Sequence, residues 1–87
     1  MLTKKDIKQF ALANVIINLK GQEPITLKNR EVYEHSNAEI RIVLPREYEF
    51  LYIKYPTKKD QNGFEAEGSK ITYTKGNIKI EFLTEKH

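Results

Sequence analysis

The sequence predicts an α+β fold, in which a short N-terminal amphipathic helix precedes an antiparallel sheet of five or six hairpin-connected strands. Apolar residues recur at helical spacing only near the start of the chain. The remainder carries β-branched and aromatic residues that alternate with polar ones, and turn-forming residues interrupt this alternation at short intervals. A chain of 87 residues is in the size range of one domain, so a single small domain is predicted over residues 1–87.

The helix is predicted over residues 4–13. Thr3 and Asp6 have the spacing of a capping box, with aspartate in place of the usual glutamate. Ile7 and Phe10 would lie on one stripe of this helix. Because a helix of about three turns is unstable alone in water, this stripe must pack on another part of the protein.

The first strands should follow directly. Residues 15–20 and 25–28 are rich in β-branched side chains and flank a turn that contains Gly21 and Pro24, so they predict a hairpin. The signal weakens over residues 29–37. A third short strand and an irregular loop explain that segment equally well.

The next two segments differ in the number of apolar faces. Over residues 38–44, Ile40 and Ile42 alternate with charged residues such as Arg41, which predicts a strand with one buried face. Residues 48–55 are apolar on both faces. That pattern predicts a central strand covered on both sides.

The C-terminal part predicts a hairpin preceded by a polar, solvated loop over residues 56–63. The turn of the hairpin fits either Lys75 and Gly76 or Gly76 and Asn77. The first choice pairs apolar residues with apolar ones and opposite charges across the strands. The second choice shifts the pairing by two residues and keeps the same faces inward, so the hairpin is predicted with its exact turn left open.

Composition excludes several kinds of chemistry. Without cysteine the chain has no disulfide, thiolate nucleophile or sulfur-ligated zinc, and a cytoplasmic location is expected. The apolar runs are only as long as strands, which predicts no membrane span. Fifteen basic and twelve acidic residues are interspersed, for a net charge of +3. The richness in lysine, isoleucine and asparagine indicates a low-GC bacterium, or a phage or mobile element of one.

Catalytic and metal-binding patterns are weak. His35 adjoins Ser36 in a polar stretch and is expected to be a surface or turn residue. Oxygen-bearing residues recur after Asp60, as in a calcium loop, but Gly63 comes fourth where an EF-hand needs its glycine sixth. We therefore expect no metal, no cofactor and no enzymatic activity.

One feature points to binding, because tyrosines and lysines are interleaved near the predicted loop and hairpin. Exposed tyrosines can stack on bases while lysines contact phosphates, and tyrosines also anchor protein interfaces. Tyrosine is equally a good strand former, and lysine commonly protects sheet edges. The candidate nucleic-acid or partner-binding residues are Tyr52, Lys54, Tyr55, Lys58, Lys59, Tyr73, Lys75 and Lys79.

The leading hypothesis is a small non-catalytic interaction protein that docks on another protein. It rests on the lack of converging chemistry, on free sheet edges and on exposed tyrosines. The alternative is a nucleic-acid-binding protein that uses the tyrosine and lysine surface. An enzyme is the third and least favoured hypothesis. Self-association is a common way for so small a domain to gain stability, and no membrane partner is expected.

Overall fold

The computed structural model describes residues 2–57, 59, 61, 63–68 and 70–83. Within them the chain forms one short α-helix, one 3₁₀ helix and seven strands. In chain order these are α1 (Lys4–Lys8), β1 (Leu12–Ile17), β2 (Ile25–Ser36), β3 (Glu39–Ile42), the 3₁₀ helix η1 (Arg46–Tyr48), β4 (Leu51–Lys54), β5 (Phe64–Glu67), β6 (Lys70–Lys75) and β7 (Ile78–Leu83).

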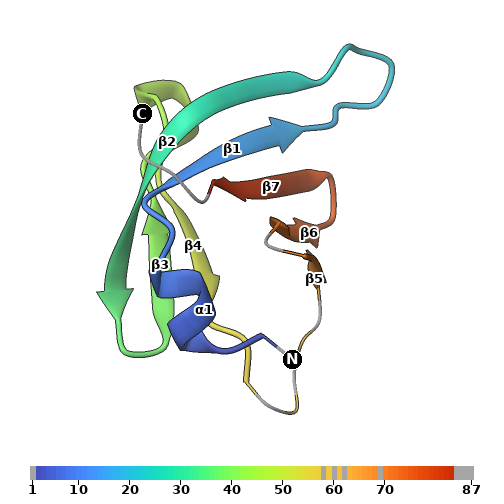
Figure 1. Ribbon diagram of the computed structural model, residues 1–87. Helices are drawn as coiled ribbons and strands as arrows, with labels where there is room; N and C mark the ends of the chain where they lie inside the picture. Colours follow the sequence, from blue (N-terminus) through green and yellow to red (C-terminus); the bar gives the residue numbers. More distant parts are fainter. Residues whose placement is uncertain (1, 58, 60, 62, 69, 84–87) are drawn as a thin grey trace.

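The seven strands form one sheet in the order β4-β3-β2-β1-β7-β6-β5, and every pair of neighbours is antiparallel. Each strand therefore pairs with the next strand in sequence, with the single exception of β4 and β5, and β7 pairs back onto β1. The sheet curls into a half-barrel whose two edges are β4 and β5, while α1 lies at one end of the concave side (Figure 1).

The predicted fold class is wrong on the helix and on the number of strands. Helix α1 ends at Lys8, so no three-turn amphipathic helix exists at the N-terminus, and the sheet has more than the expected five or six strands. Strand β1 takes over from Leu12 because Ala13 and Val15 alternate into the interior, and their strand pairs with both β2 and β7. The protein is mainly β.

The first hairpin is confirmed, since Val15 lies opposite Leu27. Strand β2 then continues to Ser36, so the segment left open between a strand and a loop is the second half of this long strand. The one-sided strand is also confirmed, because Ile40 and Ile42 of β3 are buried.

The prediction for residues 48–55 is wrong. Only Leu51–Lys54 forms a strand, and this strand is an edge of the sheet instead of a covered central strand. The outward aromatic residues on this strand and just before it are exposed, since 45% of Tyr52 and 50% of Phe50 are accessible to solvent. Two apolar faces therefore do not require two covered faces.

The C-terminal hairpin is confirmed, and its turn is the one at Gly76 and Asn77, because Lys75 lies opposite Ile78. The preceding loop prediction falls partly outside the described residues, which omit 58, 60 and 62. In the described part, the Gln61 side chain is bonded to the backbone of Leu2, accepting from its N–H at 3.1 Å and donating to its carbonyl at 3.0 Å. The loop is therefore joined to the N-terminal segment.

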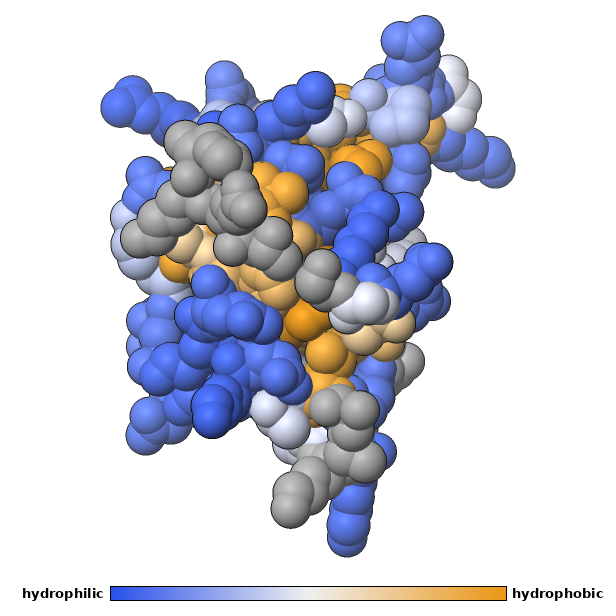
Figure 2. Space-filling model, in the orientation of Figure 1, coloured by the Kyte–Doolittle hydropathy of each residue, from blue (hydrophilic) through white to orange (hydrophobic). Residues whose placement is uncertain are grey.

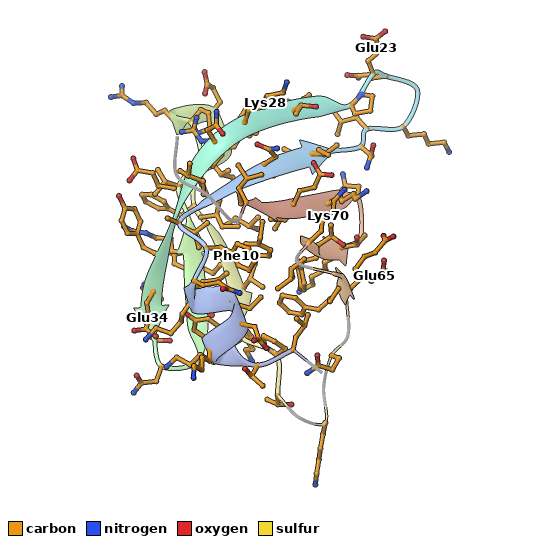
Figure 3. The ribbon with its side chains drawn as sticks, in the orientation of Figure 1. Phe10, Glu23, Lys28, Glu34, Glu65 and Lys70 are labelled. Carbon is orange, nitrogen blue, oxygen red and sulfur yellow. The ribbon has the colours of Figure 1, made fainter. Side chains whose placement is uncertain are left out.

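The core fills the concave side of the sheet. Phe10 points to the centre of the half-barrel (Figure 3), where its ring lies tilted against Phe82 with centroids 5.8 Å apart. Burial of each aliphatic side chain here contributes about 1.5–3 kcal/mol. The largest fully buried side chains are Ile7, Val15, Ile40, Ile42 and Ile80. In the described part of the chain, no helix is long and apolar enough to cross a membrane.

Helix α1 is fixed at both ends of its single turn. At its start the Asp6 carboxylate accepts the Thr3 N–H at 2.8 Å, which is the predicted capping contact. On its outer side Glu34 of β2 lies 3.1 Å from the Lys4 ammonium and 3.6 Å from that of Lys8. The hydrogen bond and charge of Lys4, assisted by Lys8, lower the pKa of the Glu34 carboxyl below its ordinary value, against a weaker effect of desolvation.

We predict that Glu34→Gln makes the free energy of unfolding less dependent on pH in the acid range. The folded-state pKa of Glu34 is lowered, so its stabilising contribution is complete above the pKa of the unfolded chain and is lost as the pH falls through the folded-state value. The free energy of unfolding, measured by urea titration between about pH 7 and about pH 3, should fall less steeply in the variant than in the wild type.

Glu23→Gln is the matched control, because it removes the same charge at the tip of the β1–β2 hairpin (Figure 3), where no ion pair is present among the described residues. It should keep the wild-type slope. If Glu34→Gln also kept the wild-type dependence of unfolding free energy on pH, the Glu34 carboxylate would not stabilise the protein through Lys4 and Lys8.

Candidate binding site at the open side of the sheet

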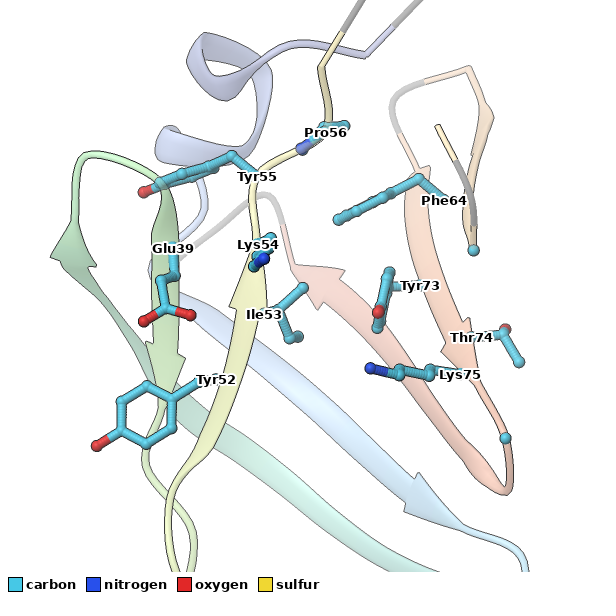
Figure 4. A pocket seen from close by; sticks show the side chains of 12 residues that line it. Glu39, Tyr52, Ile53, Lys54, Tyr55, Pro56, Phe64, Tyr73, Thr74 and Lys75 are labelled. Atoms are coloured by element: carbon cyan, nitrogen blue, oxygen red, sulfur yellow. The ribbon is translucent and has the colours of Figure 1, made fainter. Parts of the chain in front are cut away.

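A cavity of about 540 Å³ occupies the open side of the sheet, between β4 and the end of the β6–β7 hairpin. Ile53 of β4 projects into it from one side, and Phe64 and Tyr73 project from the other (Figure 4). In the space-filling view, apolar surface runs down the middle of the molecule between hydrophilic margins (Figure 2). The half-barrel therefore leaves part of its interior accessible.

One wall of the cavity depends on Gly63. Its carbonyl accepts the Thr74 N–H at 2.8 Å, which begins the pairing of β5 with β6. In the next residue pair, the rings of Phe64 and Tyr73 contact each other in a tilted arrangement, with centroids 4.6 Å apart. Gly63 has φ of +88°, and a Cβ at this position would lie 2.7 Å from the Thr74 carbonyl oxygen. Only glycine fits here without displacing the wall.

The other wall is β4, which offers backbone groups that have no hydrogen-bond partner among the described residues. Tyr55 N–H donates to the Ala38 carbonyl at 2.8 Å, and Ile53 lies opposite Ile40, so the odd-numbered residues of β4 hydrogen-bond to β3. Residues Tyr52 and Lys54 alternate with them. Their N–H and C=O groups must therefore point away from β3, toward the open side of the sheet.

The charged groups of the cavity are mainly lysines. Lys54 and Lys75 both line it, and the ammonium of Lys75 extends toward β4 (Figure 4). Neither lysine has an acidic partner within 4.0 Å among the described residues. Among the described lining residues, the one acidic side chain is Glu39, which lies 3.9 Å from the imidazole of His35.

Tyr55 closes the helix end of the cavity. It is a buried residue whose ring lies 5.4 Å from the Lys4 ammonium. Burial raises the pKa of its phenol above the ordinary value, and the nearby Glu34 carboxylate raises it further. Tyr55 is therefore a neutral structural side chain that connects β4 to α1.

A second feature lies on the outer, convex side of β2, β3 and β4. Tyr33 of β2, Arg41 of β3 and Tyr52 of β4 are direct cross-strand neighbours and form one row. The Arg41 guanidinium lies 4.7 Å from the Phe50 ring and 5.6 Å from the Tyr33 ring, while Tyr52 is 4.7 Å from the His35 ring and 6.4 Å from Phe50. We call these five residues, Tyr33, His35, Arg41, Phe50 and Tyr52, the aromatic–arginine face.

Arg41 is held at the centre of this face by its two ring neighbours. Its Nε is buried and has no hydrogen-bond partner among the described residues. Such a group is costly to leave unpaired, and an acceptor brought by a partner would remove part of this cost. The charges beside the face are balanced, because Glu31 and Glu39 share its side of the sheet with Arg41 and Lys54.

The structure divides the residues predicted from the sequence between several places. Tyr52 and Lys54 have outward side chains, whereas Tyr55 points inward, so these three do not form one surface. Five of the predicted residues nevertheless line the cavity, namely Tyr52, Lys54, Tyr55, Tyr73 and Lys75.

The other three predicted residues lie elsewhere. Lys59 is exposed in the loop between β4 and β5, and Lys58 is outside the described residues. Lys79 is exposed on β7 and lines a separate pocket of about 390 Å³ with Lys70 and Glu65. The loop and the C-terminal hairpin therefore do not form a continuous basic patch in the described structure.

Sequence reasoning missed most of the aromatic–arginine face. His35 is exposed, as expected, but it lies in β2 and contacts Tyr52. Tyr33, Arg41 and Phe50 were not predicted to be site residues. Arg41 does occupy the polar face of a clearly alternating strand, yet its cross-strand neighbours follow only from the register of β2, β3 and β4.

No group of three or more histidine, aspartate or glutamate side chains is placed to hold a metal ion within the described ranges of the chain. Comparison with protein-family models, with curated proteins and with solved structures finds no match to this chain.

We predict that Gly63→Ala destabilises the protein through both its positive φ and the close contact with Thr74. Gly21→Ala is the matched control, because Gly21 has a similar φ of +76° but no atom within 4 Å of the added Cβ. Urea unfolding should show that Gly63→Ala loses about 1–3 kcal/mol more than Gly21→Ala, as expected for overpacking. Equal losses would mean that the wall of the cavity tolerates the methyl group.

Proposed function

We propose that this protein is a non-catalytic docking module that binds another protein through its aromatic–arginine face. The observation that carries this proposal is where the exposed large hydrophobic side chains gather. In the described structure they all come from β2, β4 and the segment just before β4, and they are Tyr33 (45% exposed), Tyr48 (37%), Phe50 (50%) and Tyr52 (45%). Tyrosine, phenylalanine and arginine are enriched in protein interfaces, and tyrosine and arginine are the commonest hot spots.

The charge pattern supports a protein partner over a nucleic acid. Binding to phosphates needs an excess of positive charge on the contacting surface. Here Glu31 and Glu39 offset Arg41 and Lys54 on the same side of the sheet. A cysteine-free chain supports a cytoplasmic setting for this interaction, because small secreted domains usually depend on disulfides.

The test uses Arg41→Ala and Phe50→Ala, which truncate two contacting side chains of the face without touching the buried core. Proteins that bind the wild type in extracts of its own cells would be identified by affinity purification and quantitative mass spectrometry. Calorimetry with the purified partner should then show that each variant weakens binding about 30-fold, the loss expected at a hot spot of about 2 kcal/mol.

Lys28→Ala is the matched control, since Lys28 is exposed on the part of β2 remote from the face (Figure 3). It should bind as the wild type does. Two results would contradict the proposal. One is a partner that binds all three variants equally, and the other is retained material that proves to be nucleic acid and is removed by nuclease.

A further inference from the structure

We infer that the open side between β4 and β5 accepts one extended segment of a partner protein, which pairs with β4 as an eighth strand and carries apolar and acidic side chains. This inference rests on the proposed function and adds a second contact with the same partner, because β4 contributes both the open edge and part of the aromatic–arginine face. Four features of the described residues support it, namely strand direction, free backbone groups, the cavity and its unpaired lysines.

Strand direction explains why the sheet is open. Because all six neighbouring pairs are antiparallel, the first and last strands of the order, β4 and β5, run in the same direction. Direct pairing of these two strands would be parallel, which needs a crossover of about a dozen residues or more. The connection here spans only residues 55–63. One added strand that runs antiparallel to β4 is also antiparallel to β5, and it completes the alternation.

Free backbone groups face the opening from both edges. On β4 they are the N–H and C=O groups of Tyr52 and Lys54, as the β3 pairing requires. On β5, Gly63 and Thr74 form a hydrogen-bonded pair. The backbone N–H and C=O groups of Phe64 and Ala66 therefore point away from β6. The Phe64 N–H donates to the Gln61 carbonyl at 3.0 Å, while the Ala66 N–H and C=O have no partner among the residues that the structure describes. Main-chain hydrogen bonds of this kind contribute affinity when a strand is added to a sheet edge.

The cavity accommodates the side chains of such a strand. Alternate residues of the added strand would point inward, where Ile53, Phe64 and Tyr73 supply apolar contacts. Lys54 and Lys75 have no acidic partner among the described residues, and Lys75 extends into the opening (Figure 4). A partner strand that is complementary to this cavity therefore carries apolar residues at alternate positions and a carboxylate near Lys75.

The occupant is a lone segment and not a second copy of this domain. A strand between β4 and β5 has a neighbour on each side, so it cannot at the same time be part of another folded sheet. The strands of a second copy are each already paired on at least one side. A tail or an extended loop of a partner fits this requirement.

The test selects short random peptides displayed on phage for binding to the wild-type protein, and then compares Lys54→Pro with Lys54→Ala. Lys54→Pro removes an N–H that makes no bond to β3, a position at which an edge strand tolerates proline. Lys54→Ala removes the same side chain but keeps the N–H. Selected peptides should have alternating apolar residues and an excess of acidic ones, and should bind Lys54→Pro at least about tenfold more weakly than Lys54→Ala.

A second measurement on the wild type guards against misfolding of Lys54→Pro. In the peptide complex, the amide protons of Tyr52 and Lys54 should become protected from hydrogen exchange. Peptides that bind Lys54→Pro and Lys54→Ala equally and leave these amides unprotected overturn the inference. If such peptides lose binding in Arg41→Ala, the docking function survives while strand addition fails. Failure to select any peptide also overturns strand addition, and the partner measurements with Arg41→Ala and Phe50→Ala then decide the proposed function separately.

Discussion

The direction of the edge strands is the constraint on which the rest of this structure depends. A fully antiparallel sheet with an odd number of strands ends in two edges that run the same way, so it cannot close by antiparallel pairing. The short connection over residues 55–63 also prevents a parallel closure. The protein therefore keeps a curved, open sheet, with one side of its interior and the backbone of β4 accessible.

An open half-barrel must cover its concave side by other means. Helix α1 covers one end, where Ile7 is fully buried and Glu34 holds Lys4 and Lys8. Phe10 fills the centre against Phe82, and Gln61 joins the loop between the edge strands to the N-terminal segment. These contacts stabilise the domain without using the free edge. The edge and the adjoining aromatic–arginine face are thereby left for binding, and β4 contributes to both.

Local patterns in the sequence predicted the local structure. The β1–β2 hairpin, the one-sided strand β3 and the C-terminal hairpin each depend on alternation over a few residues. The errors arose where a pattern had two explanations. Ile7 and Phe10 have helical spacing, yet Ala13 and Val15 begin a strand, and long-range pairing with β7 decides the boundary. Likewise, the two apolar faces of β4 indicated a covered strand, although its outer side chains lie on the surface. The candidate tyrosines and lysines were chosen by residue type, but the register of the strands decides on which side of the sheet each one lies.

The most direct test of this account is amide hydrogen exchange of the free protein, followed by nuclear magnetic resonance. The pairing of β4 predicts that the amides of Ile53 and Tyr55, which face β3, exchange at least about tenfold more slowly than those of Tyr52 and Lys54, which face the open side. Equal and strong protection of all four amides would show that the outer edge of β4 is already paired, and would contradict the open sheet on which strand addition depends.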